Sequence, residues 1–156
     1  MDARKCLSER VMIGPILKSH RTEILRNNAE FVHWLSPLND DKLDYILGRA
    51  AYQRQINEAT GVLLGYSHDV DYPDHKNLIW LQRHANDTNS DERFFYIDRV
   101  IIARKAQGQG LGRRLYEDVI CFARQCGYKR LVCEVNTKPN NPRSHAFHLR
   151  MGFTAI

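Results

Sequence analysis

The sequence of 156 residues lacks the features that mark several large classes of protein. It holds no run approaching the ~18 apolar residues of a membrane-spanning helix. Its opening segment, MDARKCLSER, lacks the apolar core of a secretory signal. Internal repeats, low-complexity tracts and linkers rich in Pro, Gly or Ser are also absent. We therefore expect one domain over residues 1–156, with a cytoplasmic location and no membrane association.

Cysteine is sparse, and its spacing is not that of a metal site. The cysteines are Cys6, Cys121, Cys126 and Cys133. Because no two of them form a CxxC pair, we expect reduced thiols rather than a disulfide framework or a zinc site. His145 and His148 lie close in sequence, but no third ligand accompanies them. We therefore expect that the protein binds no metal.

Charge of one sign is not concentrated anywhere in the chain. Lys and Arg number 23 against 18 Asp and Glu, which gives a net charge of +5 without a long run of either sign. This mild excess favours an anionic ligand. Nucleic acid is not the expected partner, because no stripe of basic residues interleaves with exposed aromatic rings.

What the sequence does contain is an alternation of strand-like and helix-like segments. The first half predicts an edge strand within 11–17, helices over 19–35 and from Asn39 or Asp40, a hairpin over 52–66, a loop over 67–77 and a short strand or helix over 78–83. The second half predicts a polar loop over 85–92, strands over 94–102 and 131–135, helices from 111 to about 125 and from Asn141, and a short final strand after Gly152. This order predicts an α/β (α+β) sheet with right-handed crossovers.

The most informative segment lies between the strand over 94–102 and the helix that begins at residue 111. It contains Gln107, Gly108, Gly110 and Gly112. A helix N-terminus leaves backbone N–H groups unpaired, and glycines let phosphate oxygens approach them. A tight turn without a ligand is the alternative.

Two common phosphate-binding loops are excluded by the residues around these glycines. A P-loop requires Lys and then Ser or Thr after its last glycine, but Arg113 and Arg114 follow Gly112. A dinucleotide fingerprint requires GxGxxG near the start of a βαβ unit, whereas this loop has GxGxG deep in the chain. If the loop binds a phosphate-containing ligand, that ligand is therefore of another kind.

The arrangement Gln-x-x-Gly-x-Gly after a Val/Ile-rich strand resembles the acyl-CoA loop of the GNAT N-acetyltransferase superfamily. The segment Tyr96–Ile102 is similar to the family's fourth strand, Leu131–Val135 to its fifth, and Asn141–Phe153 to the helix that follows. The resemblance implies a mixed, mostly antiparallel central sheet flanked by helices, with the acyl-CoA loop between strand 4 and the next helix. It also implies acetyl-CoA as the acetyl-donating cosubstrate.

The resemblance further implies which residues bind acetyl-CoA. Its pyrophosphate would lie on the backbone amides of Gly108, Gln109, Gly110, Leu111, Gly112 and Arg113, with Gln107 at the entrance. Its pantetheine arm would contact the main chain of Val100, Ile101 and Ile102, and the side chain of Asn141. Arg104, Lys105, Arg113 and Arg114 would add positive charge near the phosphates. A solvated basic face is the alternative for these cations, and a helix cap for Asn141.

Three residues are candidates for proton transfer. An amine must lose a proton before it can attack a thioester. By resemblance, Glu134 is the candidate base, with Asp98 as a second, although an ordinary strand carboxylate is an alternative for Glu134. His148 stands where the family has a proton-donating tyrosine. An imidazole can serve as the acid if its pKa permits.

The implied function is transfer of an acetyl group from acetyl-CoA to a primary amine by direct attack in a ternary complex. The acceptor would be a small molecule or a peptide, and Asp69, Asp71 and Asp74 could attract it unless they form only a solvated loop. The alternative is a non-catalytic CoA-binding domain of the same fold. The family carries a further strand after the Gly-Phe strand, whereas this sequence stops at Ile156. Either that strand is missing from this sequence, or its position in the sheet is open or filled by a partner. An open edge would favour a homodimer.

Overall fold

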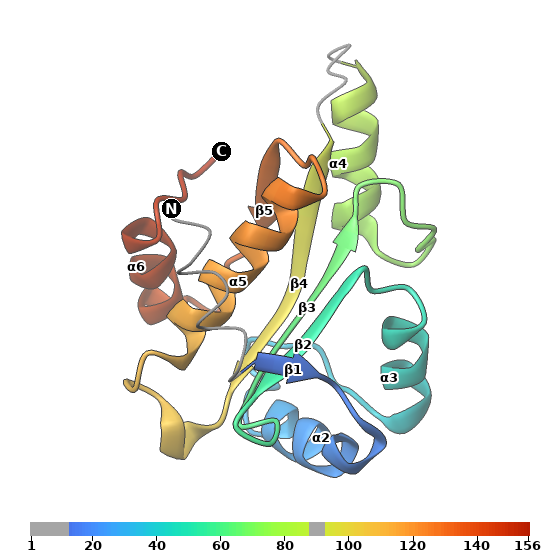
Figure 1. Ribbon diagram of the computed structural model, residues 1–156. Coiled ribbons are helices and arrows are strands. Elements are labelled where there is room, and N and C mark those ends of the chain that lie inside the picture. The colour runs from blue at the N-terminus through green and yellow to red at the C-terminus, as the bar shows by residue number, and fades with distance from the viewer. Residues whose placement is uncertain (1–12, 88–92) are drawn as a thin grey trace.

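The computed structural model describes residues 13–87 and 93–156, and their strands form one five-stranded sheet in the order β1-β2-β3-β4-β5 (Figure 1). The strands are β1 (Ile13–Pro15), β2 (Tyr52–Ile56), β3 (Gly61–Ser67), β4 (Phe94–Ile102) and β5 (Arg130–Cys133). The first four pair antiparallel, and β5 runs parallel to β4. This mixed, mostly antiparallel sheet confirms the predicted fold class.

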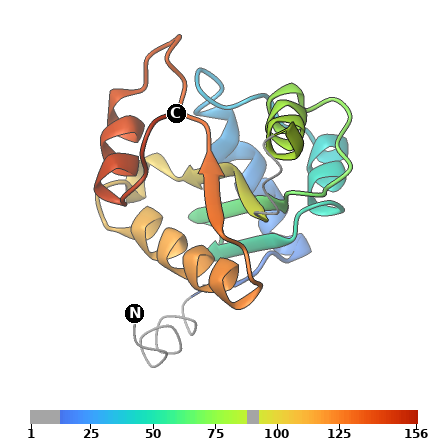
Figure 2. The ribbon, with the colours of Figure 1, turned by 90° about the horizontal axis from the view of Figure 1, so that it is seen from above.

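Helices cover both faces of the sheet (Figure 2). The helices are α2 (Arg21–Ala29), α3 (Asp40–Leu47), α4 (Lys76–Asp87), α5 (Leu111–Gln125) and α6 (Pro142–Arg150), with short 3-10 turns η1 (Lys18–His20) and η2 (Arg104–Ala106). The first three lie on one face, and α5 and α6 lie on the other. Asn39 caps α3 by accepting a hydrogen bond from Lys42 N at 2.8 Å, as the sequence predicted.

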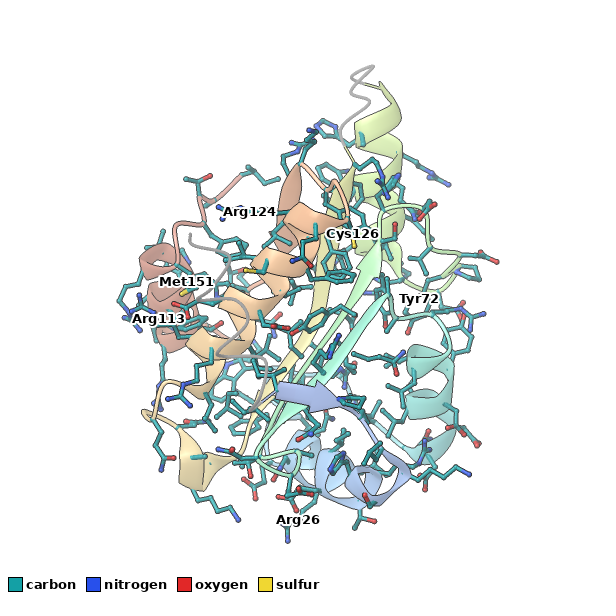
Figure 3. The ribbon with its side chains drawn as sticks, in the orientation of Figure 1. Arg26, Tyr72, Arg113, Arg124, Cys126 and Met151 are labelled. Atoms are coloured by element: carbon teal, nitrogen blue, oxygen red, sulfur yellow. The ribbon has the colours of Figure 1, made fainter. Side chains whose placement is uncertain are left out.

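Each face of the sheet has its own apolar core. The core between the sheet and α5 includes Tyr52, Ile56, Leu63, Phe95, Leu115 and Val119. The core between the sheet and α2, α3 and α4 includes Ile24, Leu43, Ile46, Val62, Leu64 and Leu78. Figure 3 shows Tyr72 on the side of α3 and α4, and Arg113 and Met151 on the side of α5 and α6. Burying one large apolar side chain stabilises the fold by roughly 1.5–3 kcal/mol, so both layers hold the sheet in place.

A bulge interrupts β4 in the middle of the sheet. Leu64 pairs with Arg99 and Gly65 pairs with Ile97, which leaves Asp98 as the extra residue. The bulge depends on Gly65, because a Cβ there would lie 2.8 Å from Tyr96 O and overlap the Phe95 ring. Because the bulge adds one residue to β4, the side chains after it lie on the opposite faces of the sheet from those that strict alternation predicts.

Beyond the bulge, β4 and β5 separate. Their parallel pairing runs from Phe94 with Arg130 to Ile97 with Cys133, and no pair of these two strands follows among the described residues. Asp98 and Glu134 are the next residues on the two strands, so both carboxylates stand where the strands part. We call this point the fork. The edge of β4 after Ile97 is therefore open to a ligand.

Several predicted elements differ from the observed ones. The helix predicted over 19–35 ends at Ala29, and turns follow it. Helix α4 replaces the short strand or helix predicted over 78–83, and it also includes the end of the loop predicted over 67–77 and the start of the loop predicted over 85–92. Residues 88–92 of that second loop lie outside the described residues. The prediction of β5 extended too far, because the strand ends at Cys133. The prediction of a final strand after Gly152 is wrong, since residues 153–156 have no regular structure.

The cysteine prediction is partly wrong. Cys126 and Cys133 are free thiols, but Cys121 is disulfide-bonded. Cys6 lies outside the described residues, as does the start of the predicted first strand. Among residues 13–87 and 93–156, no helix is both long enough and apolar enough to cross a bilayer. The cytoplasmic location and the homodimer stay predictions.

Candidate functional site

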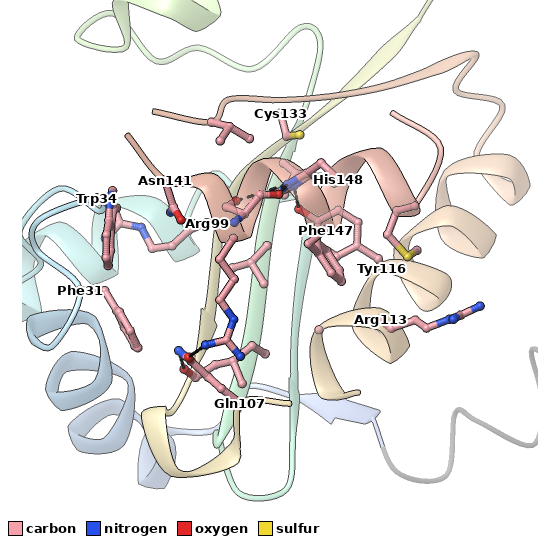
Figure 4. A pocket seen from close by; sticks show the side chains of 18 of the residues that line it. Phe31, Trp34, Arg99, Gln107, Arg113, Tyr116, Cys133, Asn141, Phe147 and His148 are labelled. Atoms are coloured by element: carbon pink, nitrogen blue, oxygen red, sulfur yellow. Dashed lines mark hydrogen bonds between the residues drawn. The ribbon is translucent and has the colours of Figure 1, made fainter. Parts of the chain in front are cut away.

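A cavity of about 710 Å³ lies at the fork (Figure 4). Four parts of the chain line it: the segment after α2, β4 from Ile97 onward, the glycine loop with the start of α5, and the segment from Cys133 to Met151. In the close view, Phe31 and Trp34 stand on one side and Arg113 on the opposite side, with Tyr116 and His148 between them. The cavity thus connects the glycine loop to the fork.

The glycine loop presents a row of backbone N–H groups. Gly108 and Gly110 have φ of 82° and 79°, and no atom lies within 4 Å of where a Cβ would stand on either. In the described part of the chain, no backbone carbonyl accepts a hydrogen bond from the N–H groups of residues 108–113. The helix dipole of α5 adds partial positive charge. The loop can therefore bind an anion such as a phosphate.

Arginines surround this loop. Arg104 and Arg113 line the cavity, while Lys105 and Arg114 do not. Helix α6 adds Arg143, whose guanidinium donates to Gln107 Oε1 at 2.8 Å. Sequence reasoning missed Arg143, because only the packing of α6 brings it to the loop. The bond fixes Gln107 at the entrance beside cationic groups suited to phosphates.

Asn141 has the capping role that its sequence context predicted. Its Oδ1 accepts a hydrogen bond from Ser144 N at 3.2 Å, and Pro142 occupies the first helical position. Asn141 also lines the cavity. The cap orients α6 and leaves the side chain at the cavity wall, so the two predicted roles are compatible.

His148 is held between two partners. Its Nδ1 lies 2.7 Å from the carbonyl oxygen of Ser144, which can only accept, so Nδ1 carries the ring proton. In the neutral ring, Nε2 then accepts from the hydroxyl of Tyr116, 2.6 Å away. Burial lowers the pKa of His148, which keeps the ring neutral. Sequence reasoning missed Tyr116, which is itself buried and has a pKa raised by burial.

Asp98 is a buried carboxylate with a hydrogen-bond donor and a cation beside it. His75 Nδ1 accepts from Leu78 N, so Nε2 carries the proton and donates to Asp98 Oδ1 at 3.0 Å. Arg99 Nε lies 3.6 Å from the other oxygen. The Arg99 guanidinium in turn donates to neutral acceptors of Asn28 and Ser36. The charge of Asp98 is therefore balanced inside the protein.

Glu134 is the contrasting carboxylate. It is exposed, lines the cavity and forms no ion pair within the described residues. Burial raises the pKa of Tyr96, and it raises the pKa of Cys133 to about 12. The negative charge of Glu134 is the next cause of both shifts. Glu134 thus brings an uncompensated negative charge to the fork.

An aromatic rim closes the cavity on the side away from Arg113. The rim consists of Phe31, Trp34 and Leu35, from the segment between α2 and α3. Trp34 joins this segment to the one after β5: its Nε1 donates to Asn140 O at 3.3 Å, and its carbonyl accepts from Asn136 Nδ2 at 2.8 Å. Sequence reasoning missed the rim, because these contacts join residues about a hundred positions apart.

Most of the predicted site residues line the cavity together. Ile101 and Gln109 do not: Ile101 is buried in the core under α2, α3 and α4, and Gln109 is exposed outside the lining. The acidic residues Asp69, Asp71 and Asp74 are exposed and lie outside the cavity wall. Among residues 13–87 and 93–156, no group of three or more His, Cys, Asp or Glu side chains gathers as a metal site.

Comparisons with known proteins give the family. The model of the acetyltransferase (GNAT) family matches residues 21–153, and the chain belongs to this family. A comparison with curated protein sequences finds no match.

Solved structures share the fold at low sequence identity. An aminoglycoside 6'-N-acetyltransferase from Acinetobacter haemolyticus superposes with a TM-score of 0.65 at 15% identity, over 92% of this chain and 90% of that one. A ribosomal-protein-alanine N-acetyltransferase from Brucella melitensis gives 0.61 at 16%, over 92% of each chain. Glucosamine-6-phosphate N-acetyltransferase from Arabidopsis thaliana gives 0.57 at 12%, over 92% of this chain and 91% of that one. Their names specify different acceptors, so the likeness supports the fold and leaves the acceptor open.

Proposed function

We propose that this protein transfers the acetyl group of acetyl-CoA to a primary amine by direct attack in a ternary complex. The observation that carries the proposal is the single cavity that joins an anion-binding glycine loop to an uncompensated carboxylate at the fork. Acetyl-CoA supplies an activated acetyl thioester. The protein supplies binding, orientation and proton transfer.

The residues of the glycine loop fit the anionic part of acetyl-CoA. The N–H groups of residues 108–113 would hold the pyrophosphate, and Arg113 and Arg143 would pair with its charge. The open edge of β4, from Asp98 to Ile102, would bind the extended amide arm through main-chain groups, as an added strand does. The side chain of Asn141, at the wall, would contact the same arm.

Glu134 is the proposed base. It is exposed to the cavity and has no counterion among the described residues, so it can attract a protonated amine and take a proton from it. Asp98 is adjacent at the fork, but His75 hydrogen-bonds one of its oxygens and the Arg99 guanidinium stands 3.6 Å from the other. We therefore assign the proton transfer to Glu134. Asp98 would keep the fork rigid.

The proposed proton donor to the departing thiolate is the pair of Tyr116 and His148. In its neutral state His148 has no N–H free, since Nδ1–H is used by Ser144. The hydroxyl of Tyr116 is the nearby donor that remains, and to act it would turn its one hydrogen from His148 Nε2 toward the negative charge developing on sulfur. His148 then acts as the residue that positions the hydroxyl.

The test is amine-dependent release of CoA thiol from acetyl-CoA, with the N-acetylated product identified by mass spectrometry across a panel of primary amines. Thiol and acetylated amine formed in equal amounts support the proposal. Binding of acetyl-CoA with no acetylation of any amine would contradict it and would favour the non-catalytic CoA-binding domain instead.

A further inference from the structure

The charges around the cavity restrict the acceptor. The lining contains the cationic residues Arg99, Arg104, Arg113, Arg143 and Arg150, and the acidic residues Asp98 and Glu134. Because Arg99 balances Asp98, only Glu134 offers an uncompensated negative charge within the described lining. One such carboxylate can bind one ammonium group. A second ammonium on the same acceptor would find no second uncompensated carboxylate in the described lining.

The aromatic rim indicates what the rest of the acceptor is like. The ring of Trp34 is held by hydrogen bonds on its Nε1 and its own backbone carbonyl, yet the residue stays 38% exposed. Phe31 and Leu35 line the same side of the cavity. A fixed ring with an accessible face offers a stacking surface at a small cost in conformational entropy.

From these two observations we infer that the acceptor is a monoamine whose amino group is carried on an aromatic or flat apolar body. The amine lies toward Glu134 at the fork, and the body lies against Trp34 and Phe31. The inference rests on the proposed acetyl transfer and adds the class of substrate. Polyamines and aminoglycosides, which carry several ammonium groups, are expected to be poor acceptors.

The experiment compares four acceptors that carry primary amines on different bodies: 2-phenylethylamine, n-propylamine, spermidine and kanamycin. We expect kcat/KM for 2-phenylethylamine to exceed that for n-propylamine and for spermidine by about tenfold or more. Trp34→Ala should raise the KM for 2-phenylethylamine about tenfold and leave the KM for n-propylamine and acetyl-CoA unchanged. Trp34→Phe, which keeps a ring, should recover most of the loss.

Trp80→Ala is the matched control. Trp80 is 57% exposed on α4 and stacks on His84 with ring centroids 5.0 Å apart. It lies outside the wall of this cavity and lines a second one, which shares Glu134 with the first. Its replacement should leave the preference for 2-phenylethylamine over n-propylamine unchanged.

The outcomes separate this inference from the proposed function. Preference for spermidine or kanamycin, or equal losses for both small amines in Trp34→Ala, would overturn the inference while acetyl transfer itself stands. If no amine is acetylated, calorimetric titration of 2-phenylethylamine into the protein saturated with CoA shows whether the cavity binds this class of amine. Binding that Trp34→Ala weakens would support the acceptor class without the reaction, and no binding would overturn both.

Discussion

The two ends of the cavity are built in different ways. The glycine-loop end consists of neighbouring residues, 107–113, whose backbone N–H groups form the binding surface, with Arg143 brought in by α6. The fork end consists of side chains from β4, β5 and the segment after α2. The first end depends on local conformation, and the second on tertiary packing. Variants at the two ends should therefore fail in different ways.

Glu134→Gln should produce the largest loss of activity. Removing the base without changing its shape should lower kcat about 10²–10³-fold, because general-base catalysis contributes on that scale. Steady-state kinetics give kcat, and calorimetry gives the affinity for CoA, which should stay unchanged because the loop end is intact. A kcat within threefold of the parent protein would show that another group takes the proton.

Asp98→Asn should instead affect stability. The change leaves Arg99 buried without its carboxylate, and breaking a buried pair costs about 3 kcal/mol. Denaturant unfolding measures the loss against the parent protein. If Asp98→Asn lost activity as Glu134→Gln should, at unchanged stability, the roles assigned to the two carboxylates would have to be exchanged.

Gly110→Ala tests the loop end. A Cβ at a residue with φ of 79° strains the backbone and stands in the row of N–H groups, so affinity for acetyl-CoA should fall about tenfold. Gly127→Ala is the matched control, since Gly127 has the same φ of 79° at the other end of α5 and does not line the cavity. Equal loss of affinity in both variants would mean that the strain, not the anion site, is responsible.

Gly65→Ala tests the bulge of β4, which lies at the fork. The added methyl group overlaps Phe95 and approaches Tyr96 O, which should destabilise the fold by about 1–3 kcal/mol. Thermal unfolding measures this change. Gly14→Ala is the control, since its nearest neighbour would be 3.5 Å from the new Cβ, and it should cost less than Gly65→Ala.

The smallest expected effect is a pH dependence of stability from His148. Burial lowers its pKa in the folded state below that in the unfolded state. The unfolded chain therefore binds the proton more readily, and the contribution of the neutral ring is lost as pH falls from above 6.5 toward the folded-state pKa. The melting temperature of His148→Gln should decline less than that of the parent protein between pH 7.5 and 5.5, measured by calorimetry. Parallel declines would contradict a buried neutral ring.

The loop end could be predicted from the sequence because its signals are local. The strand Phe94–Ile102, the helix Leu111–Gln125 and the glycines between them appear in the structure with the predicted bounds. The Asn141 cap was predictable for the same reason.

The fork end could not be predicted in the same way. No alternation pattern shows that Asp98 is a bulge residue, because the bulge comes from its pairing with β3. Tyr116 occupies a core position of an amphipathic helix, and its bond to His148 depends on how α6 packs. Trp34 was expected within a helix, but it belongs to a turn that bonds to the segment after β5.

The most direct test of the account is one quantity measured under single turnover: CoA thiol released per acetylated amine formed, for the parent protein and for Glu134→Gln. The account predicts a ratio of one in the parent protein. In Glu134→Gln it predicts the same ratio at a rate about 10²–10³-fold lower, with CoA affinity unchanged. Thiol release that does not depend on the amine, or an unchanged rate in Glu134→Gln, would contradict it.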